Sequence, residues 1–163
     1  MELRSVEAIV SALNQAEVRY VIVGGLAVNA HGYVRMTRDV DLVIELEEGN
    51  ILRGLQALFA IGYQMAIPAS PAEFANPDIR RQWRDERNML VLKLWSDSHQ
   101  RTPVDVFIYE PFDFSAEWEK LAKLELGDGL RAPVVSLESL LRMKREAGRP
   151  QDLIDIQELT RLP

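Results

Sequence analysis

The first hydrophobic pattern along the chain has the spacing of an α-helix. Val6, Ile9, Val10 and Leu13 follow the spacing i, i+3, i+4, i+7, so they fall on one side of a helix. Ser5 precedes them and has the short hydroxyl side chain that is typical of a helix N-cap. The sequence therefore predicts an amphipathic helix that begins near Ser5 and buries one face.

Short apolar runs predict a set of β-strands. In two places, consecutive runs are separated only by a polar or glycine-containing turn, which is typical of antiparallel hairpins. These hairpins pair 89–95 with 103–109 and 122–126 with 130–135, and the other predicted strands cover 18–23, 39–46 and 63–67.

Helical patterns occur between and after these strands. Residues 68–77 contain three prolines and are predicted to form a loop with at most one helical turn. Further helices are expected at 26–30, 51–59, 136–147 and 151–162, and the last two form a C-terminal helical pair over 136–162. A chain of 163 residues has the length of one domain, so 1–163 is predicted to be a single domain.

Composition and charge exclude several classes of function. The net charge of −6 argues against broad, sequence-independent nucleic-acid binding. Without cysteine the chain can form neither disulfides nor thiolate metal sites, and two histidines cannot build a histidine-rich zinc site. The longest uncharged stretch, 20–34, is too short and too polar to span a bilayer, and no signal-peptide pattern is visible. We therefore expect a cytoplasmic protein without a membrane segment.

Two acidic residues open one of the predicted strands. Asp39 and Asp41 are two residues apart, so a strand points both side chains to the same face. Adjacent carboxylates repel each other unless a cation lies between them, and hard oxygen ligands suit Mg²⁺. A polar strand end that faces water is the alternative interpretation of this common pattern.

A glycine pair lies between the first predicted strand and a short helix. Gly24 and Gly25 allow backbone N–H groups to approach a ligand closely, and the N-terminus of a helix favours a phosphate. A simple turn is the alternative. Together with the carboxylates of Asp39 and Asp41, the glycines indicate a nucleotide–Mg²⁺ site.

Three further charged residues are candidates for the site. Asp105 lies between two valines in a predicted strand, where a charge is costly unless it is solvated, paired or bound to a metal. Lys144 falls on the apolar stripe of its helix, where it either reaches out to solvent or points into a cleft. Asp152 starts the last helix, where an acid is favourable in any case. Four arginines between 80 and 87 are interpreted as a solvated surface or, as the alternative, as phosphate contacts.

These motifs together resemble the nucleotidyltransferase superfamily with the DNA polymerase β-like fold, and in particular AbiEii-type toxins and minimal nucleotidyltransferases. The resemblance rests on the glycine pair, on Arg-x-Thr-Arg before the two acids, on PVDVFI around Asp105, and on Lys-x4-Arg-x2-Asp-x2-Asp at 144–155. It implies an α/β (α+β) fold with a mixed sheet flanked by helices. Many relatives have Gly-Ser where this chain has Gly24-Gly25, so only backbone groups can hold a phosphate here.

The resemblance also implies an activity and a role for each residue. A nucleoside monophosphate would pass from an NTP to a hydroxyl of a small molecule, a protein or an RNA, and pyrophosphate would leave. Two Mg²⁺ ions are expected, with Mn²⁺ as a substitute. The expected catalytic and metal-binding residues are Asp39, Asp41 and Asp105, and the expected nucleotide-binding residues are Gly24, Gly25, Arg38, Lys144 and Asp152. The alternative is a non-catalytic or partner-dependent module of a toxin–antitoxin-like pair, and a protein partner or a homodimer stays open.

Overall fold

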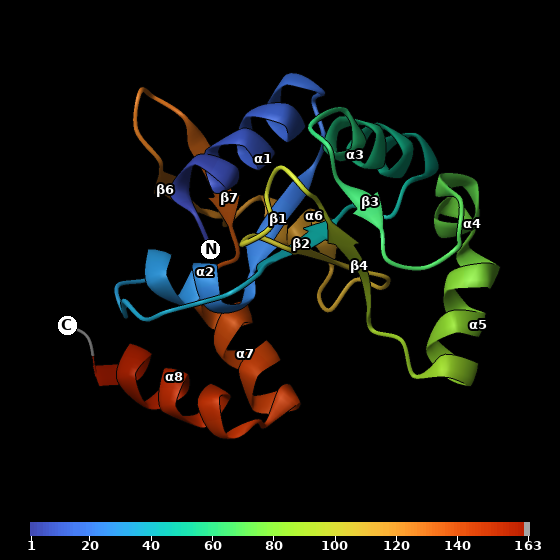
Figure 1. Cartoon of the computed structure of the whole chain (residues 1–163). Coiled ribbons are helices and arrows are strands. Elements are labelled where there is room, and N and C mark those ends of the chain that lie inside the picture. The colour runs from blue at the N-terminus through green and yellow to red at the C-terminus, as the bar shows by residue number, and fades with distance from the viewer. Residues whose placement is uncertain (162–163) are drawn as a thin grey trace.

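A computed structural model describes residues 1–161, in which seven strands form one mixed sheet with the order β3-β4-β5-β2-β1-β7-β6 (Figure 1). The strands are β1 (Tyr20–Val23), β2 (Val40–Ile44), β3 (Gln64–Met65), β4 (Val91–Trp95), β5 (Val104–Phe107), β6 (Ala122–Glu125) and β7 (Arg131–Val134). The helices are α1 (Leu3–Gln15), α2 (Gly24–Ala30), α3 (Glu48–Ala60), α4 (Pro71–Ala75), α5 (Pro77–Arg87), α6 (Phe114–Trp118), α7 (Leu137–Ala147) and α8 (Pro150–Arg161). The expected mixed sheet flanked by helices is confirmed.

Strand register determines which side chains are buried. Leu92, Val106, Leu42, Ile22 and Val134 are aligned across β4, β5, β2, β1 and β7, and all five are fully buried. Residues directly opposite each other in paired strands share a face of the sheet. This apolar row therefore forms the centre of one face of the sheet. The helices α1 and α3 lie on this side of the sheet; they contact each other, and α3 also contacts β2.

The other face of the same strands carries charge. One residue away from the apolar row, Asp41 on β2 is aligned with Asp105 on β5, and Asp105 is aligned with Lys93 on β4. Because side chains alternate between faces along a strand, this polar row must project to the side opposite the apolar row. Packing of the core thus places two acids and a lysine side by side.

The helices α7 and α8 lie at one side of the sheet, and the helices α4 and α5 lie at another (Figure 1). The helix α7 contacts α2 and α8, whereas α4 contacts α3 and α5. No helix within residues 1–161 has the length and apolar character needed to cross a membrane.

Both predicted hairpins are confirmed, as β4–β5 and β6–β7. The prediction for the start of the first helix was wrong, because α1 begins at Leu3 and buried Ser5 lies within it, with its Oγ 2.9 Å from His99 Nδ1. The start of α3 is also earlier than predicted, since the Glu47 carboxylate accepts hydrogen bonds from the N–H groups of Gly49 and Asn50. The last predicted helix residue, Leu162, lies outside the described residues.

A buried glutamate fixes the beginning of α7. Glu117, which is 1% exposed, accepts hydrogen bonds of 2.6 Å from the Ser136 N–H and from the Ser139 hydroxyl. Burial raises the pKa of Glu117, but these hydrogen bonds outweigh it and hold the pKa below its usual value. The carboxylate therefore stabilises the fold above its unfolded-state pKa, and this stabilisation is lost as the pH falls through the lowered folded-state pKa.

We expect Glu117→Ala to lower the free energy of unfolding at pH 7 by about 2–4 kcal/mol, because it leaves two buried donors without an acceptor. Urea denaturation followed by circular dichroism measures this loss. Exposed Glu119, two residues further on, provides the matched control, and Glu119→Ala should change stability by no more than about 0.5 kcal/mol. Equal losses in both variants would contradict the assignment.

Candidate active site

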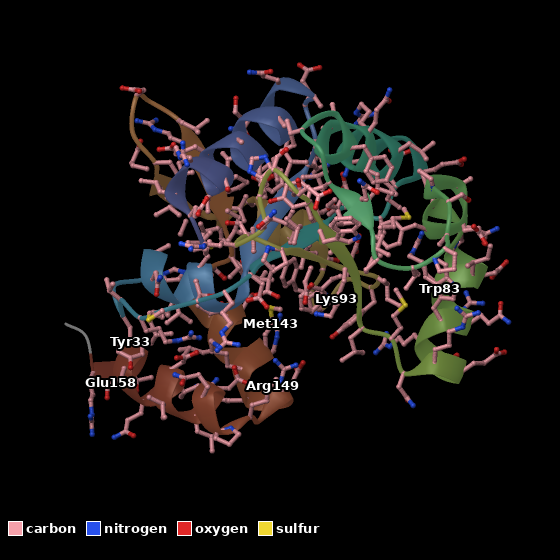
Figure 2. All side chains as sticks on the ribbon, in the orientation of Figure 1. Tyr33, Trp83, Lys93, Met143, Arg149 and Glu158 are labelled. Carbon is pink, nitrogen blue, oxygen red and sulfur yellow. The ribbon has the colours of Figure 1, made fainter. Side chains whose placement is uncertain are left out.

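One pocket of about 680 Å³ lies on the charged face of the sheet, between that face and the helices α7 and α8. Figure 2 shows Lys93 of β4 near this region, together with Met143 of α7 and Arg149 of the turn between α7 and α8. All eight residues that the sequence indicated for the site line this pocket: Gly24, Gly25, Arg38, Asp39, Asp41, Asp105, Lys144 and Asp152.

The acids of the site lie at adjacent positions on neighbouring strands. Asp39 immediately precedes β2, and Asp41 lies within it on the same face. Asp105 is the direct cross-strand neighbour of Asp41 in the parallel β2–β5 pair. The strand β5 lies inside the sheet and Asp105 is 7% exposed, so the charge of Asp105 is not simply solvated.

The glycine pair makes room for the second of these acids. Gly24 has φ +65°, and a Cβ at this position would collide with the carboxylate of Asp41. A Cβ at Gly25 would collide with the hydroxyl of Thr37. The backbone N–H of Gly25 faces Asp41 and acts to lower its pKa. Both glycines are therefore required by the close approach of the loop and strand that carry the acids.

Asp41 is held in an unfavourable place for a negative charge. Its pKa is raised from the ordinary value of 3.8 to about 7, first by burial and then by the charges of Asp39 and Asp105. Lys144 and the N–H of Gly25 act in the opposite direction but do not compensate. Neighbouring positive groups thus compensate the Asp41 carboxylate only in part, and a bound cation would favour its ionised form.

The donor set at Asp39 and Asp41 fits a hard divalent cation, because both carboxylates lie on one face and their repulsion is unrelieved. The third carboxylate is differently placed. Lys93 Nζ lies 3.0 and 3.3 Å from the two carboxylate oxygens of Asp105. In the part of the chain that the structure describes, no three acidic or histidine side chains already converge to metal-binding geometry.

A buried charge network forms the opposite wall of the pocket. Lys144, 5% exposed, contacts Asp152 at 2.9 Å and Asp155 at 2.6 Å through its Nζ. Arg35, in the loop before β2, donates from Nε and Nη2 to the two oxygens of Asp155, each at 2.7 Å. Asp152 also accepts from the backbone N–H of Arg149. The network ties α7, α8 and this loop together around the position of Lys144.

The pKa of Asp155 follows from these contacts. Burial raises it, but hydrogen bonds from Arg35, Lys144 and Gln151 outweigh burial and lower the pKa to about 2. In the sequence, Asp155 appeared only as the last acid of the Lys-x4-Arg-x2-Asp-x2-Asp motif and was not among the expected site residues. No role was predicted for Arg35, although it opens the Arg-x-Thr-Arg motif, or for Lys93, because their partners lie 120 and 12 residues away and on other elements.

The arginines between 80 and 87 do not line the pocket. Arg80 is buried and donates from Nη1 to the carbonyl oxygen of Phe74. Arg81 pairs with Asp78 on the surface of α5. Arg84 lies 4.2 Å from the ring centre of Tyr109, a residue that does line the pocket. Their contacts are those of surface and packing residues, so the alternative of direct phosphate contact has no geometric support.

We expect Asp41→Asn to stabilise the protein above neutral pH. Because the folded-state pKa of Asp41 is raised to about 7, wild-type stability falls as the pH rises from about 4 to 7. The variant has no carboxylate to ionise at this position. Its gain in the free energy of unfolding over wild type should therefore be near zero at pH 4 and on the order of 1–3 kcal/mol at pH 8.

Urea denaturation at pH 4, 6 and 8 measures this difference. Asp97→Asn, at an exposed turn position, is the matched control and should show no advantage that grows with pH. An Asp41→Asn variant that is no more stable than wild type at pH 8 would contradict the conclusion that the ionised Asp41 carboxylate destabilises the folded protein.

Solved structures with a similar fold come from nucleotidyltransferases. A lincosamide antibiotic adenylyltransferase, LnuA, in its lincomycin-bound form has a TM-score of 0.61 at 17% identity and covers 93% of this chain and 92% of that chain. A protein described as a nucleotidyltransferase from Thermotoga maritima has a TM-score of 0.57 at 17% identity, covering 98% and 92%. An antigenic nucleotidyltransferase-like protein from Paracoccidioides brasiliensis has a TM-score of 0.55 at 20% identity, covering 97% and 75%.

These likenesses confirm the expected superfamily fold. No curated protein matches the sequence. A family model, by contrast, matches residues 5–159, nearly the whole chain, and it describes aminoglycoside-2''-adenylyltransferase. The prediction that the protein is a nucleotidyltransferase is thereby confirmed, and the chain belongs to the aminoglycoside-2''-adenylyltransferase family.

Proposed function

We propose that this nucleotidyltransferase is Mg²⁺-dependent and transfers AMP from ATP to a hydroxyl of a small molecule, releasing pyrophosphate. The observation that carries the proposal is the alignment of Asp41 with Asp105, next to Gly24, in one pocket with Lys144. Family membership supports adenylyl transfer as the reaction.

The nucleotide is assigned to the side of the pocket formed by the glycine turn and α7. Gly24 offers backbone close to the acids, and exposed Arg38 supplies positive charge just before them. Lys144 is near enough to Asp41 to influence its pKa, and Asp152 and Asp155 fix its position. Preorganised positive groups of this kind stabilise the charge of a triphosphate without reorganisation. Gly25 contributes less directly, since its N–H is engaged by Asp41.

The acids are assigned to metal binding and proton transfer. Asp39 and Asp41 would hold Mg²⁺, which when bound neutralises charge on the phosphates and favours departure of pyrophosphate. The acceptor oxygen forms a bond to the α-phosphorus as the bond to the bridging oxygen of pyrophosphate breaks. Asp105, beside Asp41, takes the proton that the acceptor hydroxyl loses. The expectation of two Mg²⁺ ions, with Mn²⁺ as a substitute and Asp105 as third ligand, stays a prediction.

The acceptor is assigned to the β4–β5 side of the pocket, where Leu90, Phe107, Tyr109 and Pro111 provide an apolar wall. The pocket volume of about 680 Å³ is in the range of small-molecule sites. Aminoglycosides, from the family name, and lincosamides, from the lincomycin-bound relative, are therefore the first acceptors to test. Protein or RNA acceptors, a homodimer and a cytoplasmic location stay predictions from the sequence.

Calorimetry of ATP binding tests the nucleotide and metal assignments without an acceptor. We expect ATP to bind in the presence of Mg²⁺ and to bind at least tenfold more weakly without it. Asp39→Asn and Asp41→Asn should each weaken binding of the Mg²⁺ complex by about tenfold or more, because a hard ligand with full charge is replaced by a neutral amide.

Asp97→Asn, at an exposed residue that does not line the pocket, serves as the matched control and should bind as wild type does. ATP binding that is equally tight without Mg²⁺ and in both aspartate variants would contradict the assignment of Asp39 and Asp41 to metal binding. Absence of binding by any NTP would instead favour the non-catalytic or partner-dependent module.

A further inference from the structure

Lys93 and Asp105 form an ion pair in the site to which the sequence gives no role. They are direct neighbours in the antiparallel β4–β5 pair, so strand register alone places them together. The ammonium lies within 3.3 Å of both carboxylate oxygens of Asp105. Its side chain is 66% exposed, whereas that of Asp105 is 10% exposed, so the lysine pairs from the solvent side with a buried acid.

The pair bears on metal binding because it uses the same oxygens that a cation would use. Among the three acids, Asp39 and Asp41 share a face of β2, and only Asp105 has a lysine aligned with it across a strand pair. A divalent ion bound to Asp105 would have to displace this ammonium and then remain close to it. Repulsion at such a distance persists even in a partly solvated site.

We propose that Lys93 is the resident cation of Asp105 and competes with a second divalent ion for this carboxylate. The inference rests on the proposed function, since it concerns the same site. Before substrates bind, the enzyme then holds one divalent ion, at Asp39 and Asp41, and Asp105 stays paired with Lys93. Lys93 is a positioning residue: its ion pair holds the Asp105 carboxylate in place and out of metal coordination, so that this acid is available to the acceptor hydroxyl.

Titration with Mn²⁺ alone tests the competition, with free Mn²⁺ measured by electron paramagnetic resonance. The wild type should bind one Mn²⁺ and a second only much more weakly. Lys93→Gln should tighten the second binding step about tenfold, the effect expected from losing one partly solvated ion pair together with its repulsion. Lys93→Arg, which keeps the charge, should resemble the wild type. Lys123→Gln, on the exposed edge strand β6, is the matched control.

A double variant identifies the carboxylate. In Lys93→Gln/Asp105→Asn the tightened second step should disappear, whereas the first step should remain as in the wild type. The inference is overturned if Lys93→Gln leaves the second step unchanged, or if the double variant keeps the gain. A wild type that binds no Mn²⁺ would remove the metal site of the proposed function itself, and calorimetry of ATP binding then shows separately whether the nucleotide site survives.

Discussion

Repulsion among carboxylates on one face of the sheet is the constraint on which the site depends. Asp41 and Asp105 are aligned by the same register that aligns the buried row of Leu42 and Val106, so the fold cannot form its core without bringing the acids together. Asp39 adds a third charge, and burial makes the charge on Asp41 more costly still. A protein retains such strain when the function uses it, and cation binding is the use that fits these ligands.

Several neighbouring residues accommodate or pair with the negative charge of these carboxylates. Gly24 gives the Asp41 carboxylate the space that a side chain would fill, and Lys93 pairs with Asp105. Lys144 of α7 lies near the acids of the sheet, but its ammonium is buried and is paired with the carboxylate of Asp155. That carboxylate is paired in turn with the guanidinium of Arg35. Buried charges of this kind are tolerated only as a complete network, since removing one partner leaves another uncompensated. The network therefore fixes the C-terminal helices against the loop that leads into β2, and with them the shape of the pocket.

The sequence predicted those parts of the fold and site that follow from local patterns. Alternation within a strand predicted that Asp39 and Asp41 share a face, and hairpin turns predicted the pairing of β4 with β5. Parallel pairing of β2 with β5 depends on contacts between segments about 60 residues apart, and no local pattern contains it. For the same reason no role could be predicted for Lys93 within its mostly apolar strand, and Arg35 was only the first residue of the Arg-x-Thr-Arg motif, without a predicted partner. Their importance depends on the partner, Asp105 or Asp155, which only the folded chain brings near.

Transfer of label from ATP distinguishes nucleotidyl transfer from other uses of this site. With ATP labelled at the α-phosphate, Mg²⁺ and a panel of aminoglycosides and lincosamides, we expect labelled acceptor and an equal amount of pyrophosphate. Both should be lost in Asp39→Asn and Asp41→Asn and retained in Asp97→Asn. Label that appears only when ATP is labelled at the γ-phosphate, or transfer that persists in both aspartate variants, would contradict nucleotidyl transfer at this site.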